Sequence, residues 1–301
     1  MPLGYDKRIY IMAFDHRGSF IKLFGLSGEL SAADTARISD GKMLIFEGLQ
    51  RAIADGASRE AAGVLVDEQF GAAVARAAKE EGMPFAMPVE KSGQDEFDFE
   101  YGDEFGAHIE DFDPTFSKVL VRSNPDWPGE VNERQFQRLR RLSDWLHDRE
   151  RRFLFELLVP GTAEQLAGVG GDAGRYDTEV RPKLMLRSIE AIQGVGIEPD
   201  IWKIEGVDSS ATCAEIAALV RRDGRDGIGC VVLGRGADDA AVESWLRAGA
   251  AVEGYLGFAI GRSIFNASVK GVASGTMSRE EGQALISQKY RHFVDVYEGR
   301  A

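Results

Sequence analysis

The alternation of short apolar runs with helix-like stretches is the feature of this sequence that most limits its fold. Stretches with helical periodicity, among them residues 69–82, 133–148 and 211–222, separate most of the apolar runs. Eight strand–helix repeats predict an α/β protein with a single parallel (β/α)8 barrel, which a chain of 301 residues can form as one domain over residues 1–301. The predicted strands are residues 10–14, 63–67, 84–88, 117–122, 153–158, 200–204, 229–233 and 254–260.

A doubly wound parallel sheet would show the same alternation. Such a sheet binds its cofactor through a glycine pattern in the first strand–helix turn. Here residues 15–19 of that turn read Asp-His-Arg-Gly-Ser and lack the pattern. Residues 168–173 match it formally, but they do not lie between a predicted strand and a helix. The sequence therefore favours the barrel.

Composition and charge exclude several classes of protein. Hydrophobic residues make up 44% of the chain, which is enough for one large core, and the formal net charge of -13 argues against a nucleic-acid partner. Cys213 and Cys230 are too few for a disulfide framework and indicate a reducing compartment. The first residues lack a signal-peptide pattern and no apolar run is long enough to cross a membrane, so we expect a cytoplasmic protein without a membrane partner.

Two lysines lie inside predicted strands, where a positive charge is costly. Lys118 and Lys203 are surrounded by β-branched and other apolar residues, whereas most other lysines fall in polar, helix-like stretches and are expected to be solvated. A buried ammonium must be paired or lose its proton. A neutral lysine is a nucleophile that can form a Schiff base with a carbonyl substrate.

Strand side chains alternate between the barrel interior and the helix layer, so each predicted strand can be assigned an inward face. Because Trp202 and Ile204 are expected to face the helices, Lys203 and Glu205 point inward. The same rule predicts a charged interior group near the C-terminal ends of the strands, formed by Asp15, Lys118, Glu156 and Lys203.

Each of these residues also has a purely structural interpretation. Either lysine can be the partner of a buried acid, and Glu156 is the obvious candidate for that acid. Asp15 can cap the segment that follows it.

Glycine–arginine pairs follow the last two predicted strands. In (β/α)8 barrels these two loops often bind phosphate, because glycine lets backbone N–H groups approach and arginine adds charge-assisted hydrogen bonds. We therefore predict an anion site, with its candidate residues in both loops and in the first turn: Arg17, Ser19, Gly234, Arg235, Gly261 and Arg262.

The sequence predicts no metal site. The four histidines show no spacing typical of zinc ligands. A weakly held magnesium on carboxylates such as Asp67 and Glu68 stays open as an alternative.

Two segments interrupt the regular repeat. Residues 94–114 follow the third predicted strand and residues 161–177 follow the fifth, at the end of the barrel that carries binding loops. They are either active-site covers or simple surface loops.

Several of these motifs together resemble the class I tagatose-1,6-bisphosphate aldolase family. The resemblance rests on residues 13–19 (Ala-Phe-Asp-His-Arg-Gly-Ser), Lys118, Glu156, residues 202–205 (Trp-Lys-Ile-Glu) and residues 261–262 (Gly-Arg). Residues 89–102 also resemble the barrel domain that is fused to a sugar kinase in bacterial myo-inositol catabolism proteins. The resemblance spans nearly the whole chain. It departs at His16, where the tagatose enzymes are expected to have glutamine, which puts the hydroxyl pattern of the substrate in doubt.

The resemblance implies a class I aldolase that needs no organic cofactor. Lys203 would form the Schiff base, Glu156 would transfer protons and Arg262 would bind a phosphate. Lys118 and Asp15 would contact substrate hydroxyls or the carbinolamine. In the inositol branch the phosphorylated sugar would be 2-deoxy-5-keto-gluconate 6-phosphate, cleaved to dihydroxyacetone phosphate and malonate semialdehyde.

Two other classes of function stay open. A phosphosugar isomerase or epimerase would use Lys203 only as an electrostatic clamp, and a sugar-phosphate-binding protein would have no activity. Exposed outer helices are compatible with a homo-oligomer.

Overall fold

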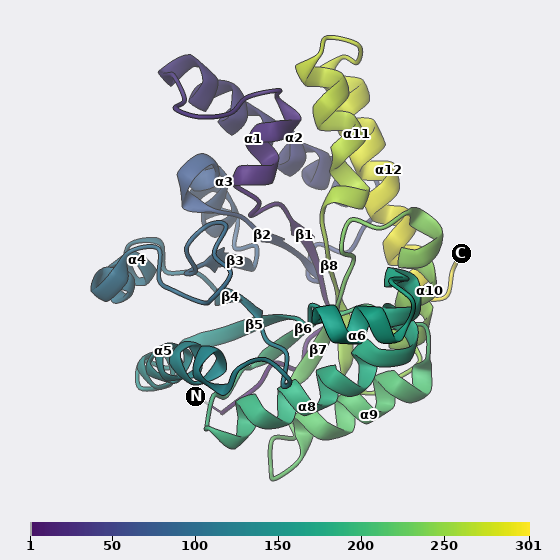
Figure 1. Ribbon diagram of the computed structural model, residues 1–301. Helices are drawn as coiled ribbons and strands as arrows, with labels where there is room; N and C mark the ends of the chain where they lie inside the picture. The colour runs from purple at the N-terminus through teal and green to yellow at the C-terminus, as the bar shows by residue number, and fades with distance from the viewer. Residues whose placement is uncertain (1) are drawn as a thin grey trace.

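The predicted barrel of eight parallel strands is confirmed by the computed structural model, which describes residues 2–301 (Figure 1). Strand β1 pairs with both β2 and β8, and this closes the barrel. The strands begin and end within a residue or two of the predicted positions. They are β1 (Ile9–Ala13), β2 (Ala62–Leu65), β3 (Phe85–Pro88), β4 (Phe116–Arg122), β5 (Arg152–Leu158), β6 (Ile201–Glu205), β7 (Gly229–Leu233) and β8 (Tyr255–Ile260).

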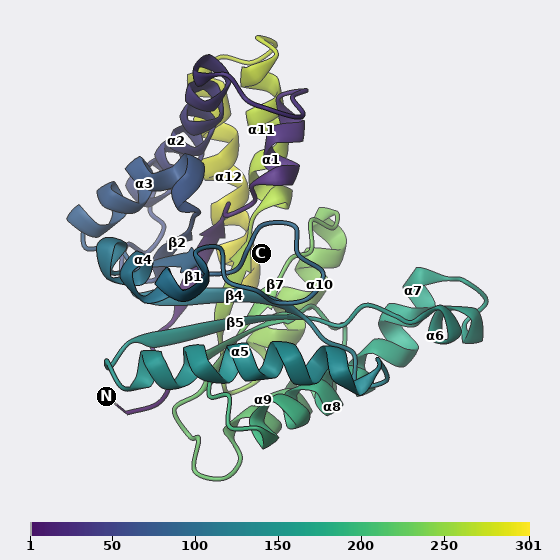
Figure 2. The same cartoon turned by 60° about the vertical axis from the view of Figure 1, so that its left-hand side comes forward.

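Helices surround the barrel between successive strands. The longer ones are α2 (Ala32–Ala54), α3 (Glu68–Glu80), α4 (Phe105–Phe112), α5 (Gly129–His147), α8 (Arg181–Gly194), α9 (Ser210–Arg221), α10 (Asp239–Ala250), α11 (Arg262–Ala273) and α12 (Arg279–Tyr297). Figures 1 and 2 show α2, α11 and α12 rising together past the barrel, with the short α1 (Gly18–Leu23) beside them. Within residues 2–301, no helix has the length and apolar content needed to cross a membrane.

Side-chain oxygens define where several of these helices begin. Ser31 accepts a hydrogen bond from the N–H of Asp34 at the start of α2, and the Asp34 carboxylate accepts from the Ser31 N–H in return. Asp67 caps α3 by accepting from the N–H of Phe70 at 2.9 Å. Such caps satisfy amide groups that a helix leaves unpaired at its N-terminus.

The inward and outward faces of the strands follow the predicted alternation. Val119, Phe155 and Trp202 lie in the core between the strands and the helices. The barrel interior is a separate apolar cluster, formed by Ile9, Ile11, Ala13, Leu65, Ala86, Phe116, Leu154, Ile201, Val231 and Ala259. The charged inward residues lie toward the C-terminal ends of the strands. The apolar interior cluster lies below them, toward the N-terminal ends.

The segment at residues 94–114 is more than a loop or a cover. It contains the short 3-10 turn η1 (Gly102–Glu104) and helix α4, which connects β3 to β4. Phe97 and Phe99 are buried, and their rings pack edge to face with centroids 5.2 Å apart. The backbone of Phe99 forms an isolated antiparallel β-bridge with Glu90. Burial of these rings anchors the segment against the barrel, while residues 91–94 remain at the cavity.

The segment at residues 161–177 stands away from the barrel. It carries α6 (Ala163–Gly168) and α7 (Ala173–Arg175) and leads into a π-helical turn, η2 (Tyr176–Val180). Figure 2 shows α6 and α7 projecting beyond the C-terminal ends of the strands. The Tyr176 hydroxyl ties the segment back by donating to the carbonyl of Val159 at 2.8 Å.

We expect the contact between α2 and α12 to be sensitive to added volume. A Cβ atom at Gly48 in α2 would lie 2.5 Å from Cγ2 of Ile286 in α12. Gly48→Ala should therefore lower the free energy of unfolding by about 1–3 kcal/mol, measured by chemical denaturation. Gly194→Ala is the control, because an added Cβ there has no neighbour within 4 Å. An unchanged stability for Gly48→Ala would mean that the two helices separate easily.

Candidate active site

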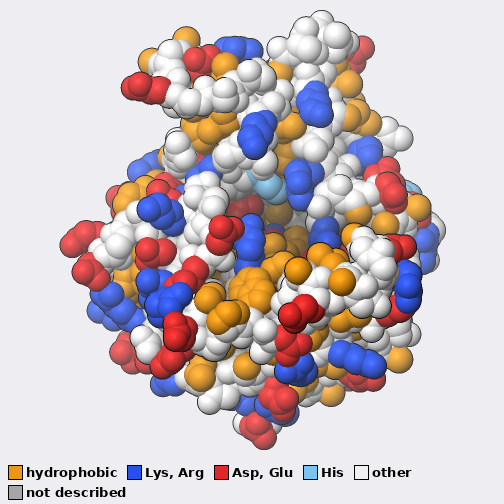
Figure 3. Space-filling view, in the orientation of Figure 1, with side chains coloured by type: hydrophobic (Ala, Val, Ile, Leu, Met, Phe, Trp, Pro, Cys, Tyr) orange, Lys and Arg blue, Asp and Glu red, His pale blue; other side chains and the backbone are white. Residues whose placement is uncertain are grey.

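A cavity of about 640 Å³ opens at the C-terminal ends of the strands. Figure 3 shows a hollow near the centre of this face, with Lys and Arg side chains around it. The walls come from the β1–α1 turn and from the segments that follow β3, β5, β7 and β8. Asp15, Lys118, Glu156 and Lys203 all line the cavity, as the alternation rule predicts.

Lys118 is held by three carboxylates. Its Nζ lies 2.8 Å from Oδ2 of Asp15, 2.6 Å from Oε1 of Glu90 and 3.0 Å from Oε2 of Glu156. Its side chain is 1% exposed. Burial opposes the charge, but Asp15, Glu156 and Glu90 outweigh it and raise the pKa of Lys118 well above its ordinary value. Lys118 is therefore a fixed positive charge that donates hydrogen bonds to Asp15 and Glu90 and forms an ion pair with Glu156.

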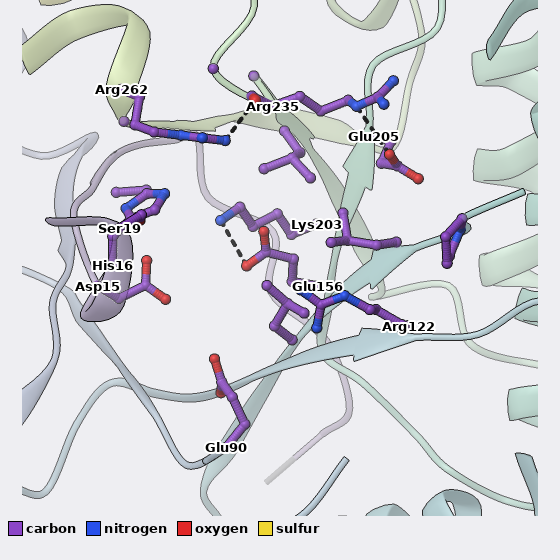
Figure 4. Close-up of a pocket in the computed structure, with 18 of the residues that line it drawn as sticks. Asp15, His16, Ser19, Glu90, Arg122, Glu156, Lys203, Glu205, Arg235 and Arg262 are labelled. Carbon is purple, nitrogen blue, oxygen red and sulfur yellow. Dashed lines mark hydrogen bonds and ion pairs between the residues drawn. The ribbon is translucent and has the colours of Figure 1, made fainter. Parts of the chain in front are cut away.

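Lys203 has a different environment. Its Nζ lies 2.9 Å from Oε2 of Glu156, the same oxygen that contacts Lys118 (Figure 4). In the described part of the chain, this Nζ forms no other ion pair and no hydrogen bond. Lys203 thus lines the cavity with Glu156 as its ion-pair partner. Its amine is placed to contact a molecule bound in the cavity.

The three carboxylates of the cluster differ in how readily they take up a proton. Burial alone would raise the pKa of Glu156, but Lys118 and Lys203 lower it overall. Burial is likewise outweighed at Asp15, whose pKa is lowered by the same two lysines. At Glu90 burial prevails over Lys118 and raises the pKa. Glu90 is thus the acid of the cluster that most easily holds a proton.

From the sequence, Glu90 is placed at this end of the barrel as either a scaffold residue or a substrate contact, but its place in the lysine cluster is not predicted. It lies two residues beyond β3, outside the regular alternation, so the inward-facing rule does not apply to it. The sequence signal that could have placed Glu90 in the cluster is its position just after a predicted strand.

The arginines that line the cavity, namely the predicted Arg17, Arg235 and Arg262 together with Arg122, fall into two groups. Arg17 and Arg235 line the cavity, but their charges are balanced by nearby carboxylates. Nη1 of Arg17 lies 3.0 Å from Glu100 Oε2, and Nη1 of Arg235 lies 2.6 Å from Asp177 Oδ2. Arg235 also lies 3.1 Å from Oε1 of Glu205. These two arginines are engaged in holding the cavity walls together.

Arg262 and Arg122 are free of carboxylates. Nη2 of Arg262 donates to the carbonyl of Arg235 at 2.7 Å, and Nη1 of Arg122 donates to the carbonyl of Gln94 at 2.7 Å. Within residues 2–301 neither guanidinium forms an ion pair. Both line the cavity, so each offers uncompensated positive charge to a bound anion.

The predicted glycines Gly261 and Gly234 lie close to their neighbours, Gly261 against backbone and Gly234 against a side chain. A Cβ at Gly261 would lie 1.9 Å from the carbonyl oxygen of Ala13, and one at Gly234 would lie 3.1 Å from Ile260. Gly236 has a φ of +74° and lies under Arg262, whose Cζ would be 2.8 Å from an added Cβ. Gly236 thus leaves room for the Arg262 side chain to cross the loop after β7. Ser19 lines the same cavity from α1.

His16 lines the cavity and also has a buried ring nitrogen without a partner. Its Nδ1 is buried and has no hydrogen-bond partner among the described residues. Burial lowers the pKa of His16 to about 4, and the charges of Lys42 and Arg262 act in the same direction. The ring is therefore neutral at pH 7 and can exchange hydrogen bonds with a substrate hydroxyl.

Lys42 contradicts the expectation that lysines in helix-like stretches are solvated. It lies in α2, yet it is completely buried and its Nζ is 2.6 Å from Oδ2 of Asp67. This contact engages one of the two carboxylates suggested for magnesium, and the other, Glu68, accepts a hydrogen bond from Tyr101 at 3.1 Å. No three His, Cys, Asp or Glu side chains between residues 2 and 301 come together in an arrangement that could hold a metal ion.

The fold is a (β/α)8 barrel with a cavity at the C-terminal ends of its strands, and comparison with known proteins agrees on the fold. The chain belongs to the family described as "Uncharacterized protein conserved in bacteria (DUF2090)", which matches residues 4–301. A fructose-bisphosphate aldolase from Plasmodium falciparum is similar with a TM-score of 0.64 at 11% sequence identity, over 98% of this chain and 92% of that chain. Cgl0159 from Corynebacterium glutamicum is similar with a TM-score of 0.56 at 15% identity, over 96% and 88%.

No curated protein matches the sequence. At these identities the structural likeness shows the fold alone.

The neutral state of His16 can be tested by titration. Folded His16 binds a proton near pH 4, whereas an ordinary histidine does so near 6.5. The unfolded chain therefore takes up more protons between these values, and this residue lowers the free energy of unfolding by about 3 kcal/mol as the pH falls from 6.5 to 4. NMR of the imidazole signals should place the His16 transition near pH 4, and His16→Gln should flatten the pH dependence. A transition near 6.5 would contradict the buried, neutral ring.

Proposed function

We propose that the protein is a class I aldolase that cleaves a phosphorylated ketose through a Schiff base on Lys203. The observation that carries the proposal is the difference between the two interior lysines. Lys118 forms ion pairs with three carboxylates, whereas Lys203 pairs with only one among the described residues, Glu156, and lines the cavity. A lysine nucleophile needs a free amine pointing toward its substrate, and Lys203 meets this requirement.

The proposed reaction uses the cluster as follows. Neutral Lys203 attacks the ketone carbon, and the carbinolamine loses water to give an iminium ion. The substrate hydroxyl next to the scissile bond loses its proton, the carbon–carbon bond breaks, and its electron pair enters the iminium as an enamine. Glu156, 2.9 Å from Nζ of Lys203, is the proposed group that accepts and returns protons. The aldehyde product leaves, Glu156 returns the proton to the enamine carbon to regenerate the iminium ion, and hydrolysis of this iminium ion releases the ketone product and restores Lys203.

Lys118 and Asp15 have supporting roles in this proposal. The fixed charge of Lys118 keeps Glu156 and Asp15 ionised, because it lies 3.0 and 2.8 Å from their oxygens. Together they present a charged wall to the substrate hydroxyls and to the carbinolamine.

The anionic ends of the substrate are assigned to the two arginines without carboxylate partners. Arg262 is proposed to bind the phosphate. Figure 4 shows Arg122 on another side of Lys203, where it could bind a second anionic group. A sugar acid phosphate such as 2-deoxy-5-keto-gluconate 6-phosphate carries one negative group at each end and fits this arrangement. Its products would be dihydroxyacetone phosphate and malonate semialdehyde.

The imine can be trapped chemically. Borohydride treatment with dihydroxyacetone phosphate should add one reduced adduct to the protein, and peptide mapping should place it on Lys203. Lys203→Met should abolish the adduct, and Lys91→Ala, which removes an exposed lysine at the cavity, should keep it. Glu156→Gln should slow adduct formation by roughly 10²- to 10⁴-fold, because the proton-transfer group is lost.

Other outcomes of the trapping experiment are equally informative. An adduct on Lys118 would keep the aldolase and reverse the roles of the two lysines. An absence of adduct with dihydroxyacetone phosphate and also with 2-deoxy-5-keto-gluconate 6-phosphate would exclude the proposal and leave an isomerase, an epimerase or a binding protein.

The two arginines can be separated by kinetics. Arg262→Ala and Arg122→Ala should each raise KM for 2-deoxy-5-keto-gluconate 6-phosphate by about 10- to 100-fold, the range expected for a lost charge-assisted hydrogen bond. Arg187→Ala is the control, since Arg187 does not line the cavity and forms an exposed ion pair with Asp126 at 2.8 Å. A normal KM for Arg122→Ala would show that the substrate does not contact this arginine.

A further inference from the structure

Lys42 is the third buried lysine of the chain and lies outside the charged cluster. It sits on the apolar side of α2, four residues after Ile38 and three before Ile45, both of which are fully buried. The spacing places a positive charge on the face that packs against the barrel. A buried ion pair is seldom more stable than a well-packed apolar pair of similar volume, so this lysine calls for an explanation other than stability.

The three N–H groups of Lys42 are all occupied. They donate to the carbonyl of Phe14, to the carbonyl of His16 at 2.8 Å and to Oδ2 of Asp67 at 2.6 Å. The ammonium also lies 4.4 Å from the centroid of the Phe20 ring. Asp67 is itself held in place because its other oxygen caps α3. Lys42 therefore connects α2 and α3 to the backbone that leaves β1.

The two carbonyls that Lys42 holds lie on either side of Asp15. Upstream, the N–H of Phe14 is bonded to the carbonyl of Leu65 at 2.8 Å, so the backbone is fixed there as well. Between the two carbonyls, the Asp15 carboxylate accepts a hydrogen bond from Nζ of Lys118 at 2.8 Å. The direction of the Asp15 carboxylate thus depends on backbone that is held in place by Lys42.

We propose that Lys42 is a positioning residue of the candidate active site. It holds the carbonyls of Phe14 and His16 so that Asp15 stays on Lys118 and the His16 ring stays in the cavity wall. Its effect on catalysis rests on the proposed aldolase function, but its effect on Asp15 and Lys118 does not. The effect of Lys42 on catalysis and its effect on the Asp15–Lys118 contact can therefore be measured separately.

The test removes the Lys42–Asp67 pair without leaving a buried charge. Lys42→Met/Asp67→Asn keeps the side-chain length at residue 42 and an oxygen that can still cap α3. The control is Tyr290→Phe, which also removes a buried hydrogen bond to β1, from the Tyr290 hydroxyl to the carbonyl of Tyr10 at 2.8 Å. Tyr10 lies at the opposite end of the strand from Asp15, so the control reports general weakening of β1.

The readout is the reactivity of Lys118 toward trace acetic anhydride, measured by peptide mass spectrometry with exposed Lys183 as the internal standard. The groups that face Lys118 are Asp15, Glu90 and Glu156. Loss of the Asp15 contact should raise acetylation of Lys118 about tenfold, the equivalent of one hydrogen bond to a charged group. Tyr290→Phe should leave it unchanged.

Two results would overturn the proposal. Unchanged acetylation of Lys118 in the double variant would show that Asp15 is held without Lys42. An equal increase in Tyr290→Phe would show that any weakening of β1 has the same effect. Should the double variant fail to fold, Lys42→Gln/Asp67→Asn is measured instead. It retains an amide donor, and acetylation should still exceed that of the unaltered protein; no increase would again overturn the proposal.

Borohydride trapping then separates this inference from the proposed function. The double variant should form the Lys203 adduct more slowly than Tyr290→Phe does. If the unaltered protein forms no adduct but acetylation of Lys118 changes as expected, Lys42 is a positioning residue and the aldolase proposal fails. If the adduct forms normally in the double variant and acetylation is unchanged, the aldolase stands and the role of Lys42 is excluded.

Discussion

The charged centre of the barrel depends on one carboxylate oxygen, Oε2 of Glu156, which lies 3.0 Å from Nζ of Lys118 and 2.9 Å from Nζ of Lys203. Parallel pairing produces this contact, because Glu156 on β5 is the register partner of Lys203 on β6. A shift of one residue would turn every side chain of a strand to its other face and place the charges among the helices. Two buried ammonium groups without this acid would be strongly unfavourable. The same contacts distinguish the lysines, since Lys118 is enclosed by carboxylates and Lys203 is not.

An acidic protein can still present positive charge to an anion. The chain carries a formal net charge of -13, and Arg17 and Arg235 at the cavity are balanced by nearby carboxylates. Arg262 and Arg122 line the cavity without such a partner among the described residues. Carbonyl oxygens orient both guanidinium groups while leaving their charge uncompensated. Local pairing, rather than the total charge, therefore decides where an anionic substrate could bind.

Support for the cavity extends into the surrounding helices. Lys42 in α2 and Asp67 before α3 reach the backbone beside Asp15, and Arg235 ties the loop after β7 to Asp177. Barrels of this kind carry many different chemistries on one scaffold, so membership in the family and likeness to an aldolase fold do not by themselves assign a reaction. The proposed reaction is specific because it depends on named contacts of Lys203, Glu156 and Arg262.

The sequence by itself determined the eight strands, the class of barrel and the inward direction of Lys118, Glu156 and Lys203. These follow from local alternation, which side-chain geometry dictates within a strand. Only the tertiary structure decided which arginines are free, because Glu100 and Asp177 reach Arg17 and Arg235 from segments distant in the chain. It also decided that Glu90 joins the cluster from beyond a strand end. Lys42 could be read as buried from its helical spacing, but its partners depend on how α2 packs against β1, and that long-range packing is absent from any local pattern.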